Sequence, residues 1–163
     1  MAPVLVRSDR WYAVDADRRR VWAAFGATER YRRWWPWLVE FDGGPLEPGA
    51  EWRCAVSPPL PYVVRFTLTL DRVEEGRSIH ASVDGDITGS AVLDVVDGPA
   101  TGPDDPGPGS LDGAPCRIHL RSWLAPTHPL LKVVASAASP VVRRGHDWVL
   151  DNGIRQFRAV TGV

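Results

Sequence analysis

The residue of this sequence best suited to chemistry is a histidine near the end of the chain. His146 lies in a stretch, 140–160, whose apolar positions recur at steps of three and four residues, which is typical of one face of an α-helix. That face carries Val142, His146, Val149, Leu150, Gly153, Phe157 and Val160. An imidazole there can hydrogen-bond a ligand or act as a general acid or base. The alternative is a core histidine bonded to the backbone or a strand, or a solvated position at the helix start.

Two further polar side chains fall on strand positions that we expect to face the interior. Tyr62 and Ser122 alternate in step with apolar neighbours, as does the weakly polar Cys54. These groups are able to orient an apolar ligand. They are few for a catalyst, because acid–base chemistry needs two titratable groups within reach of each other. His146 and Tyr62 are therefore candidate catalytic residues without an assigned reaction.

Other polar residues are interpreted as surface groups. Asp147 and Asp151 stack on one helix face, where a buried carboxylate pair would be able to transfer protons, but the arginines around them favour a surface charge network. His80, His119 and Arg121 fall on the polar register of their strands, as do Arg53, Arg65 and Arg117. We expect them on the outer face of the sheet unless a bulge shifts the register.

Composition and charge exclude several classes of protein. The chain has 163 residues, enough for one domain with a core and a cavity. Its net charge of −1 shows no signature of binding to nucleic acid or to an anionic membrane, and no apolar run reaches the ~18 residues that insert into a bilayer. Cys54 and Cys116 lack metal-ligand spacing, which favours reduced thiols in a cytoplasmic protein. No nucleotide-binding, metal or nucleophile motif is present, so we expect no cofactor and no metal.

The elements that would position these residues follow from periodicity and breakers. A first strand is followed by two short helices. The first helix is capped by Asp15 and has Asp17 in its first turn. The second helix begins at Thr28 and ends near Trp35, because Pro36 disfavours helical geometry in the residue before it. Six more strands and the long helix complete the order. Each strand is apolar on one face, which predicts an antiparallel sheet with one covered face in an α+β domain. The expected strands are 4–14, 38–41, 50–56, 62–70, 79–83, 87–96 and 116–124.

One segment differs in composition from the rest. Residues 98–115 contain five glycines and five prolines in eighteen positions. This density predicts a flexible surface insertion between two strands. Because the strands on both sides need each other, we expect one domain over 1–163.

The order of elements and three segments resemble the START/Bet v 1-like (SRPBCC) superfamily, and within it the polyketide cyclase/dehydrase-like branch. The segments are YRRWWPW at 31–37, GDITG at 85–89 and GHDWVLDNG at 145–153. The resemblance implies a helix-grip fold, in which a seven-stranded antiparallel sheet wraps around a long C-terminal helix and leaves a cavity between them. Members of this superfamily bind lipids, sterols or aromatic polyketides, and some catalyse cyclisation or dehydration.

Periodicity and this fold together give a set of candidate ligand-binding residues. Trp35 and Trp37 flank Pro36 at a helix end, where the cavity mouth would form, although tryptophans are core residues by default. Gly153 lies within the long helix, where glycine costs about 1 kcal/mol relative to alanine. It indicates either close packing against a strand or Trp11, or room for a ligand. The candidates are Trp35, Trp52, Tyr62, Phe66, Val83, Leu93, Ser122, His146, Val149, Leu150 and Gly153.

Three functions are compatible with this pattern. The leading one is a monomeric or homodimeric protein that binds a small hydrophobic molecule, aromatic polyketide-like or lipid-like, in the internal cavity. The second is an aromatase/cyclase that uses the same cavity. The third is an interaction module in which 98–115 or 34–37 contacts a partner.

Overall fold

A seven-stranded antiparallel sheet grips one long helix, which confirms the predicted helix-grip fold. The computed structural model describes residues 6–59, 62–98, 115–137 and 139–161. The strand order across the sheet is β1-β7-β6-β5-β4-β3-β2. The strands are β1 (Val6–Val14), β2 (Leu38–Asp42), β3 (Glu51–Val56), β4 (Val64–Glu74), β5 (Ser78–Gly85), β6 (Ile87–Asp97) and β7 (Cys116–Pro126). The helices are α1 (Arg18–Gly26), the 3₁₀ turn η1 (Thr28–Arg30), α2 (Tyr31–Trp34), α3 (Pro129–Ala137) and α4 (Ser139–Thr161).

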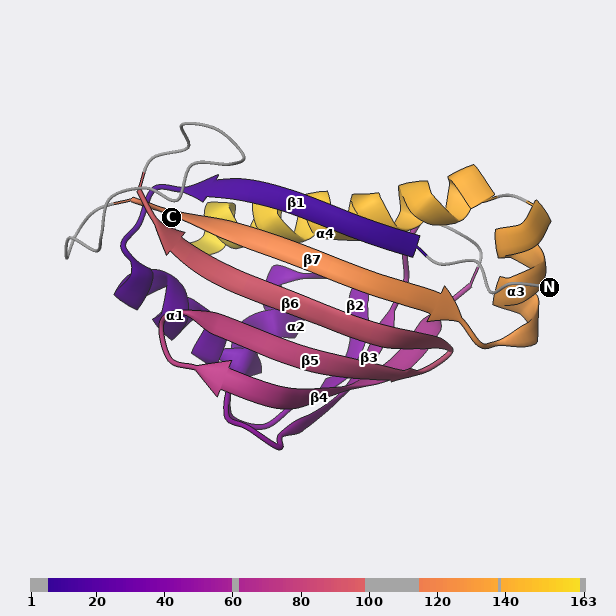
Figure 1. Cartoon of the computed structure of the whole chain (residues 1–163), viewed down its shortest axis with the longest axis horizontal. Helices are drawn as coiled ribbons and strands as arrows, with labels where there is room; N and C mark the ends of the chain where they lie inside the picture. The colour runs from indigo at the N-terminus through magenta and orange to yellow at the C-terminus, as the bar shows by residue number, and fades with distance from the viewer. Residues whose placement is uncertain (1–5, 60–61, 99–114, 138, 162–163) are drawn as a thin grey trace.

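The strands form one curved layer, and α4 lies along the concave side of that layer (Figure 1). Consecutive strands from β2 to β7 pair as a meander, and β1 closes the other edge by pairing with β7 over the whole of its length. The helices α1 and α3 lie at opposite ends of the sheet (Figure 1). Among the described residues, no helix combines the length and apolar character that crossing a bilayer needs.

The first helix begins two residues later than the sequence pattern predicted. The Asp17 carboxylate, not that of Asp15, caps α1 by accepting a hydrogen bond from the Arg20 backbone N–H at 2.8 Å. This is the usual N-cap contact, which satisfies one of the unpaired donors of the first turn. The end of α2 agrees with the prediction, since the helix ends at Trp34 and Trp35 leaves helical geometry before Pro36.

Strand β4 is longer than predicted because a bulge interrupts its alternation. The register with β5 shifts between Leu70 and Arg72, so that Val73 again packs against the core after buried Leu70. One extra residue on one strand resets which positions face inward. Strict alternation therefore underestimates the length of the strand.

The outer face of the sheet is partly covered, which corrects one prediction. Arg53 and Arg65 are exposed as their register indicates, and His80 is half-buried. Arg117, however, is only 2% exposed. Its guanidinium lies 5.1 Å from the centre of the Trp11 ring, and that ring stacks on His119 at 3.9 Å. The position does face away from α4, but an aromatic neighbour shields it from solvent.

The predicted insertion at 98–115 falls mostly outside the described residues, which stop at Gly98 and resume at Pro115. The pairing of β6 with β7 continues up to the ends of this segment, where Asp97 lies opposite Cys116. The Gly98 N–H donates to the Pro115 carbonyl at 3.0 Å. The two strands are thus held together on either side of the segment.

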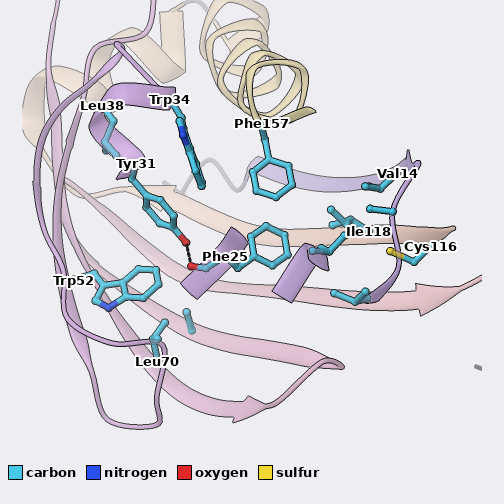
Figure 2. Close-up of a cluster of buried hydrophobic side chains, with 14 of the residues drawn as sticks. Val14, Phe25, Tyr31, Trp34, Leu38, Trp52, Leu70, Cys116, Ile118 and Phe157 are labelled. Atoms are coloured by element: carbon cyan, nitrogen blue, oxygen red, sulfur yellow. Dashed lines mark hydrogen bonds between the residues drawn. The ribbon is translucent and has the colours of Figure 1, made fainter. Parts of the chain in front are cut away.

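The C-terminal half of α4 packs into a dense aromatic core (Figure 2). Phe157 is 0% exposed, stacks on Phe25 at 5.1 Å and meets Trp34 edge-on at 5.9 Å. The Tyr31 hydroxyl donates to the Phe25 carbonyl, so this buried polar group is satisfied. Tyr31 also contacts Trp52 edge-on at 5.9 Å. Large rings from α1, α2, β3 and α4 fill this end of the interior.

Candidate functional site

A cavity of about 260 Å³ lies beside the N-terminal half of α4. Side chains from every strand except β2 line it, together with residues of α3 and α4. On β7, alternate residues project into it, and on α4 the helical repeat does the same over two turns. The cavity and the aromatic core therefore lie at different positions along the same concave face of the sheet.

Seven of the eleven candidate ligand-binding residues lie on the wall of this cavity. Six of them come from the strands or from α4, as the alternation of the strands and the stripe of the helix indicated, whereas Tyr62 was predicted within a strand and lies in the loop before β4. The seven are Tyr62, Phe66, Val83, Ser122, His146, Val149 and Leu150. That they contact a ligand stays a prediction.

Two candidates, Trp52 and Leu93, belong to the aromatic core instead of the cavity wall. Trp52 is 6% exposed within that core, and Leu93 packs against it. Both project toward the interior as predicted, so the alternation was correct. They lie at a different position along the strand from the cavity, because alternation specifies a face of the sheet but not which stretch of that face is open.

The other two candidates, Trp35 and Gly153, contact each other. The Trp35 indole N–H donates to the Gly153 carbonyl at 2.8 Å, and the Trp37 indole N–H donates to Gln156 Oε1 at 2.8 Å. A Cβ placed on Gly153 would lie 3.4 Å from Trp37 Cζ2. The glycine thus lies under two tryptophans, and neither Trp11 nor a strand makes the close approach. Residues 35–37, the expected cavity mouth, thus form a packing surface for α4 and are not among the described residues of the cavity wall.

Several wall residues were not predicted as site residues. Val64, Leu68 and Ala91 had the inward register and were recognisable from alternation alone. Pro58 lies in a loop, and Leu131 belongs to the short helix α3. Their positions depend on how the chain turns outside the sheet, for which a period of two or 3.6 residues carries no signal.

Three of the wall residues carry a polar side-chain atom beyond the backbone, and two of these touch. They are Tyr62, Ser122 and His146. Ser122 Oγ lies 3.3 Å from His146 Nε2, and Ser122 is only 4% exposed. His146 Nδ1 is buried without a hydrogen-bond partner, with Asp147 Oδ1 3.9 Å away. Among the residues that the structure describes, no charged side chain lines the wall.

Burial keeps the titratable groups of the wall uncharged. It lowers the pKa of His146 from its ordinary value of 6.5, and the nearby Asp147 carboxylate opposes this only in part. Burial likewise raises the pKa of Tyr62, so its hydroxyl stays protonated at neutral pH. The site is therefore an apolar chamber with neutral hydrogen-bonding groups.

The Asp147 and Asp151 carboxylates of α4 bind side chains of the edge strand β1. Asp147 forms an ion pair with Arg10 at 3.0 Å, and Asp151 accepts a hydrogen bond from the Tyr12 hydroxyl at 3.0 Å. Both partners belong to β1, whereas the sequence indicated a network with arginines of the helix itself. These contacts hold the helix segment that carries His146 over the cavity.

The architecture defines this chain as a protein of the START/Bet v 1-like helix-grip fold, and three solved structures share it. The START superfamily protein from Mycobacterium smegmatis is 12% identical over 96% of this chain and 97% of its own, with a TM-score of 0.67. The di-domain ARO/CYC StfQ from the steffimycin biosynthetic pathway is 10% identical over 96% of this chain and 50% of its own, with a TM-score of 0.63. Norcoclaurine synthase from Thalictrum flavum, in complex with dopamine and hydroxybenzaldehyde, is 12% identical over 97% of this chain and 87% of its own, with a TM-score of 0.62.

No protein-family model matches this chain, and no curated protein matches it. At identities this low, the structural likeness establishes the fold that the sequence pattern indicated.

Proposed function

We propose that this protein binds a small hydrophobic molecule in the cavity between the sheet and the N-terminal half of α4. The observation that carries the proposal is the cavity itself, about 260 Å³, whose described wall residues are apolar apart from three neutral polar side chains. Concave apolar chambers with a few convergent polar groups are the usual form of small-molecule sites. The fold shared with a START superfamily protein and with a biosynthetic ARO/CYC protein is consistent with this use.

The proposal is tested by filling the cavity. Ala91 lines the wall from β6, and Ser90 before it is exposed on the opposite face of the same strand. Ala91→Phe is expected to weaken the binding of naphthalene, an uncharged apolar probe, by at least about tenfold, because the new ring takes the space of the ligand. Ser90→Phe is the matched control and should bind like the wild type. Isothermal titration calorimetry measures both, and equal binding by the two variants would contradict the proposal.

A second candidate function is cyclisation of a poly-carbonyl chain, and the Ser122–His146 contact favours it. His146 or Tyr62 would then transfer protons at the wall of the cavity. If His146 only orients a ligand, His146→Gln should weaken binding by about 0.5–1.5 kcal/mol. If it transfers protons, the same variant should lower product formation about 10²–10⁴-fold while binding persists. The carboxylate nearest to His146, that of Asp147, is paired with Arg10, so binding is the favoured role.

A further inference from the structure

The contact between Ser122 and His146 specifies which polar group a ligand would bring to the cavity. Ser122 Oγ is 3.3 Å from His146 Nε2, and the other ring nitrogen, Nδ1, is 3.9 Å from Asp147 Oδ1. The Asp147 carboxylate is in turn held by Arg10 at 3.0 Å. The Ser122 hydroxyl, the His146 imidazole and the Asp147 carboxylate therefore form a row in space that runs from the cavity wall toward the sheet edge.

This order assigns the proton of the neutral imidazole. A lone pair on Nδ1 would face a carboxylate oxygen and be repelled, whereas an N–H at Nδ1 is attracted to it. The proton therefore belongs on Nδ1, and Nε2 is an acceptor. Since the Ser122 hydroxyl is the group within reach of Nε2, it donates its hydrogen there. What the serine still offers is the lone pairs of its oxygen.

A ligand that reaches this point must supply a donor and no charge. A carboxylate brings only acceptors and a negative charge, and the described part of the wall holds no cation to balance it. An ammonium group would be a donor but equally lacks a partner of opposite charge on the wall. A hydroxyl group is neutral, and its O–H is able to donate to the free lone pair of Ser122 Oγ.

On the basis of the proposed function, we propose that the cavity selects an apolar molecule bearing one uncharged hydroxyl, an alcohol or phenol, whose O–H donates to Ser122 Oγ. The volume limits its size. A volume of about 260 Å³ lies just below the usual range of small-molecule pockets, about 300–1,000 Å³, which favours a compact ligand. A hydroxylated bicyclic aromatic has about this size.

Three naphthalene derivatives separate the hydroxyl from its alternatives. 2-Naphthol has the donor, 2-methoxynaphthalene keeps the oxygen but lacks the donor, and 2-naphthoate carries a charge. At pH 7.5, 2-naphthol should bind about two- to tenfold more tightly than the methyl ether, the range of one net hydrogen bond. 2-Naphthoate should bind at least about 100-fold more weakly, because a carboxyl with an ordinary pKa near 4.3 is neutral in only about one molecule in a thousand at that pH. Isothermal titration calorimetry on the full chain gives all three constants.

A serine on the neighbouring strand provides a matched control. Ser122→Ala alone would free the His146 Nε2 lone pair to accept the ligand O–H in place of the serine, so both acceptors are removed together. 2-Naphthol and its methyl ether should bind the double variant Ser122→Ala/His146→Leu equally. Ser8 lies directly opposite Ser122 in the β1–β7 register and is also buried, but it does not line the cavity. Ser8→Ala should therefore retain the wild-type preference. The pair 1-decanol and decanoate extends the comparison to a linear body, and decanol should bind more tightly.

The outcomes separate this inference from the function on which it rests. Naphthoate binding within tenfold of naphthol would overturn the hydroxyl assignment and leave hydrophobic binding intact, as would a naphthol preference that survives in the Ser122→Ala/His146→Leu double variant. If neither naphthalene nor any of the three derivatives binds the wild type, the proposed function fails and the inference falls with it.

Discussion

The two halves of α4 lie over the same continuous sheet, but one half packs into a filled core and the other borders a cavity. Near its C-terminal end, Phe157 is fully buried among rings from α1, α2 and β3. Near its N-terminal end, His146 and Val149 face a cavity of about 260 Å³ with mainly aliphatic walls. The large rings gather where the helices α1 and α2 cover the sheet, and where they are absent the interior stays open. One half of the helix thus stabilises the fold, and the other half is available to a ligand.

The largest difference between the halves is expected for loss of a phenyl ring. Phe157→Ala should lower the free energy of unfolding by about 3–5 kcal/mol, since the ring is surrounded on all sides. Phe66→Ala makes the same chemical change at the cavity wall and should cost less than half as much, because one side of that ring has no packing contacts to lose. Urea unfolding of both variants measures this, and equal losses would remove the distinction between the halves.

A larger side chain should also affect the two halves differently, and two paired alanines allow the comparison. Ala81 and Ala91 lie directly opposite each other on β5 and β6, but Ala81 belongs to the packed core and Ala91 lines the cavity. Ala81→Leu should destabilise the protein by about 1–3 kcal/mol through overpacking, whereas Ala91→Leu has space and should be near neutral. Thermal unfolding compares them. A loss at Ala91 as large as that at Ala81 would show that the cavity is closed to added atoms.

Burial of the His146 imidazole in the half of the interior with the cavity makes the stability of the protein depend on pH. The pKa of His146 is lowered in the folded protein, while its unfolded value is about 6.5. As pH falls from about 6.5 toward the folded value, the unfolded chain takes up a proton that the folded protein does not, so stability is lost, by at most about 1.4 kcal/mol per pH unit. The stability of the wild type minus that of His146→Gln should therefore decline over this window and be constant above it. A difference that stays flat or increases with acidification would contradict the buried, neutral assignment.

The smallest expected effect concerns the glycine under the tryptophans. A Cβ on Gly153 would make an ordinary contact with Trp37 Cζ2 at 3.4 Å, and the bond from Trp35 to the Gly153 carbonyl would be retained. Gly153→Ala should thus stabilise the protein by about 0.5–1 kcal/mol through helix propensity. Calorimetric unfolding is sensitive enough to detect the change. Destabilisation instead would mean that the aromatic half is packed too tightly to admit a methyl group.

Most of the fold was predictable because it depends on local periodicity. Alternation located all seven strands, and the helical repeat located α4 and the inward direction of His146. Alternation also assigned Ser122 to the interior, where it lines the cavity; Tyr62 lines the cavity too, but from the loop before β4 and not from the strand that was predicted there. These predictions needed only knowledge of which face of an element is apolar.

The position of the cavity along that apolar face was not predictable in the same way. Trp35, Trp52 and Gly153 were expected at the site, but they lie in or against the aromatic core. Whether an inward residue meets a neighbour or a void depends on the size of side chains from distant segments, which periodicity does not encode. The burial of Arg117 under Trp11 has the same origin, since a ring on β1 covers a position on β7.

The central claim is that the open half of the interior, and not the aromatic half, receives a ligand. Methyl NMR during a titration with naphthalene tests it directly, because Val and Leu methyl groups occur in both halves. The methyl signals of Val83, Leu124 and Val149 on the cavity wall should shift and show contacts to the ligand, while those of Val14, Val21 and Leu70 in the core should not. Shifts confined to the core methyl groups, or no shifts in either set, would contradict the claim.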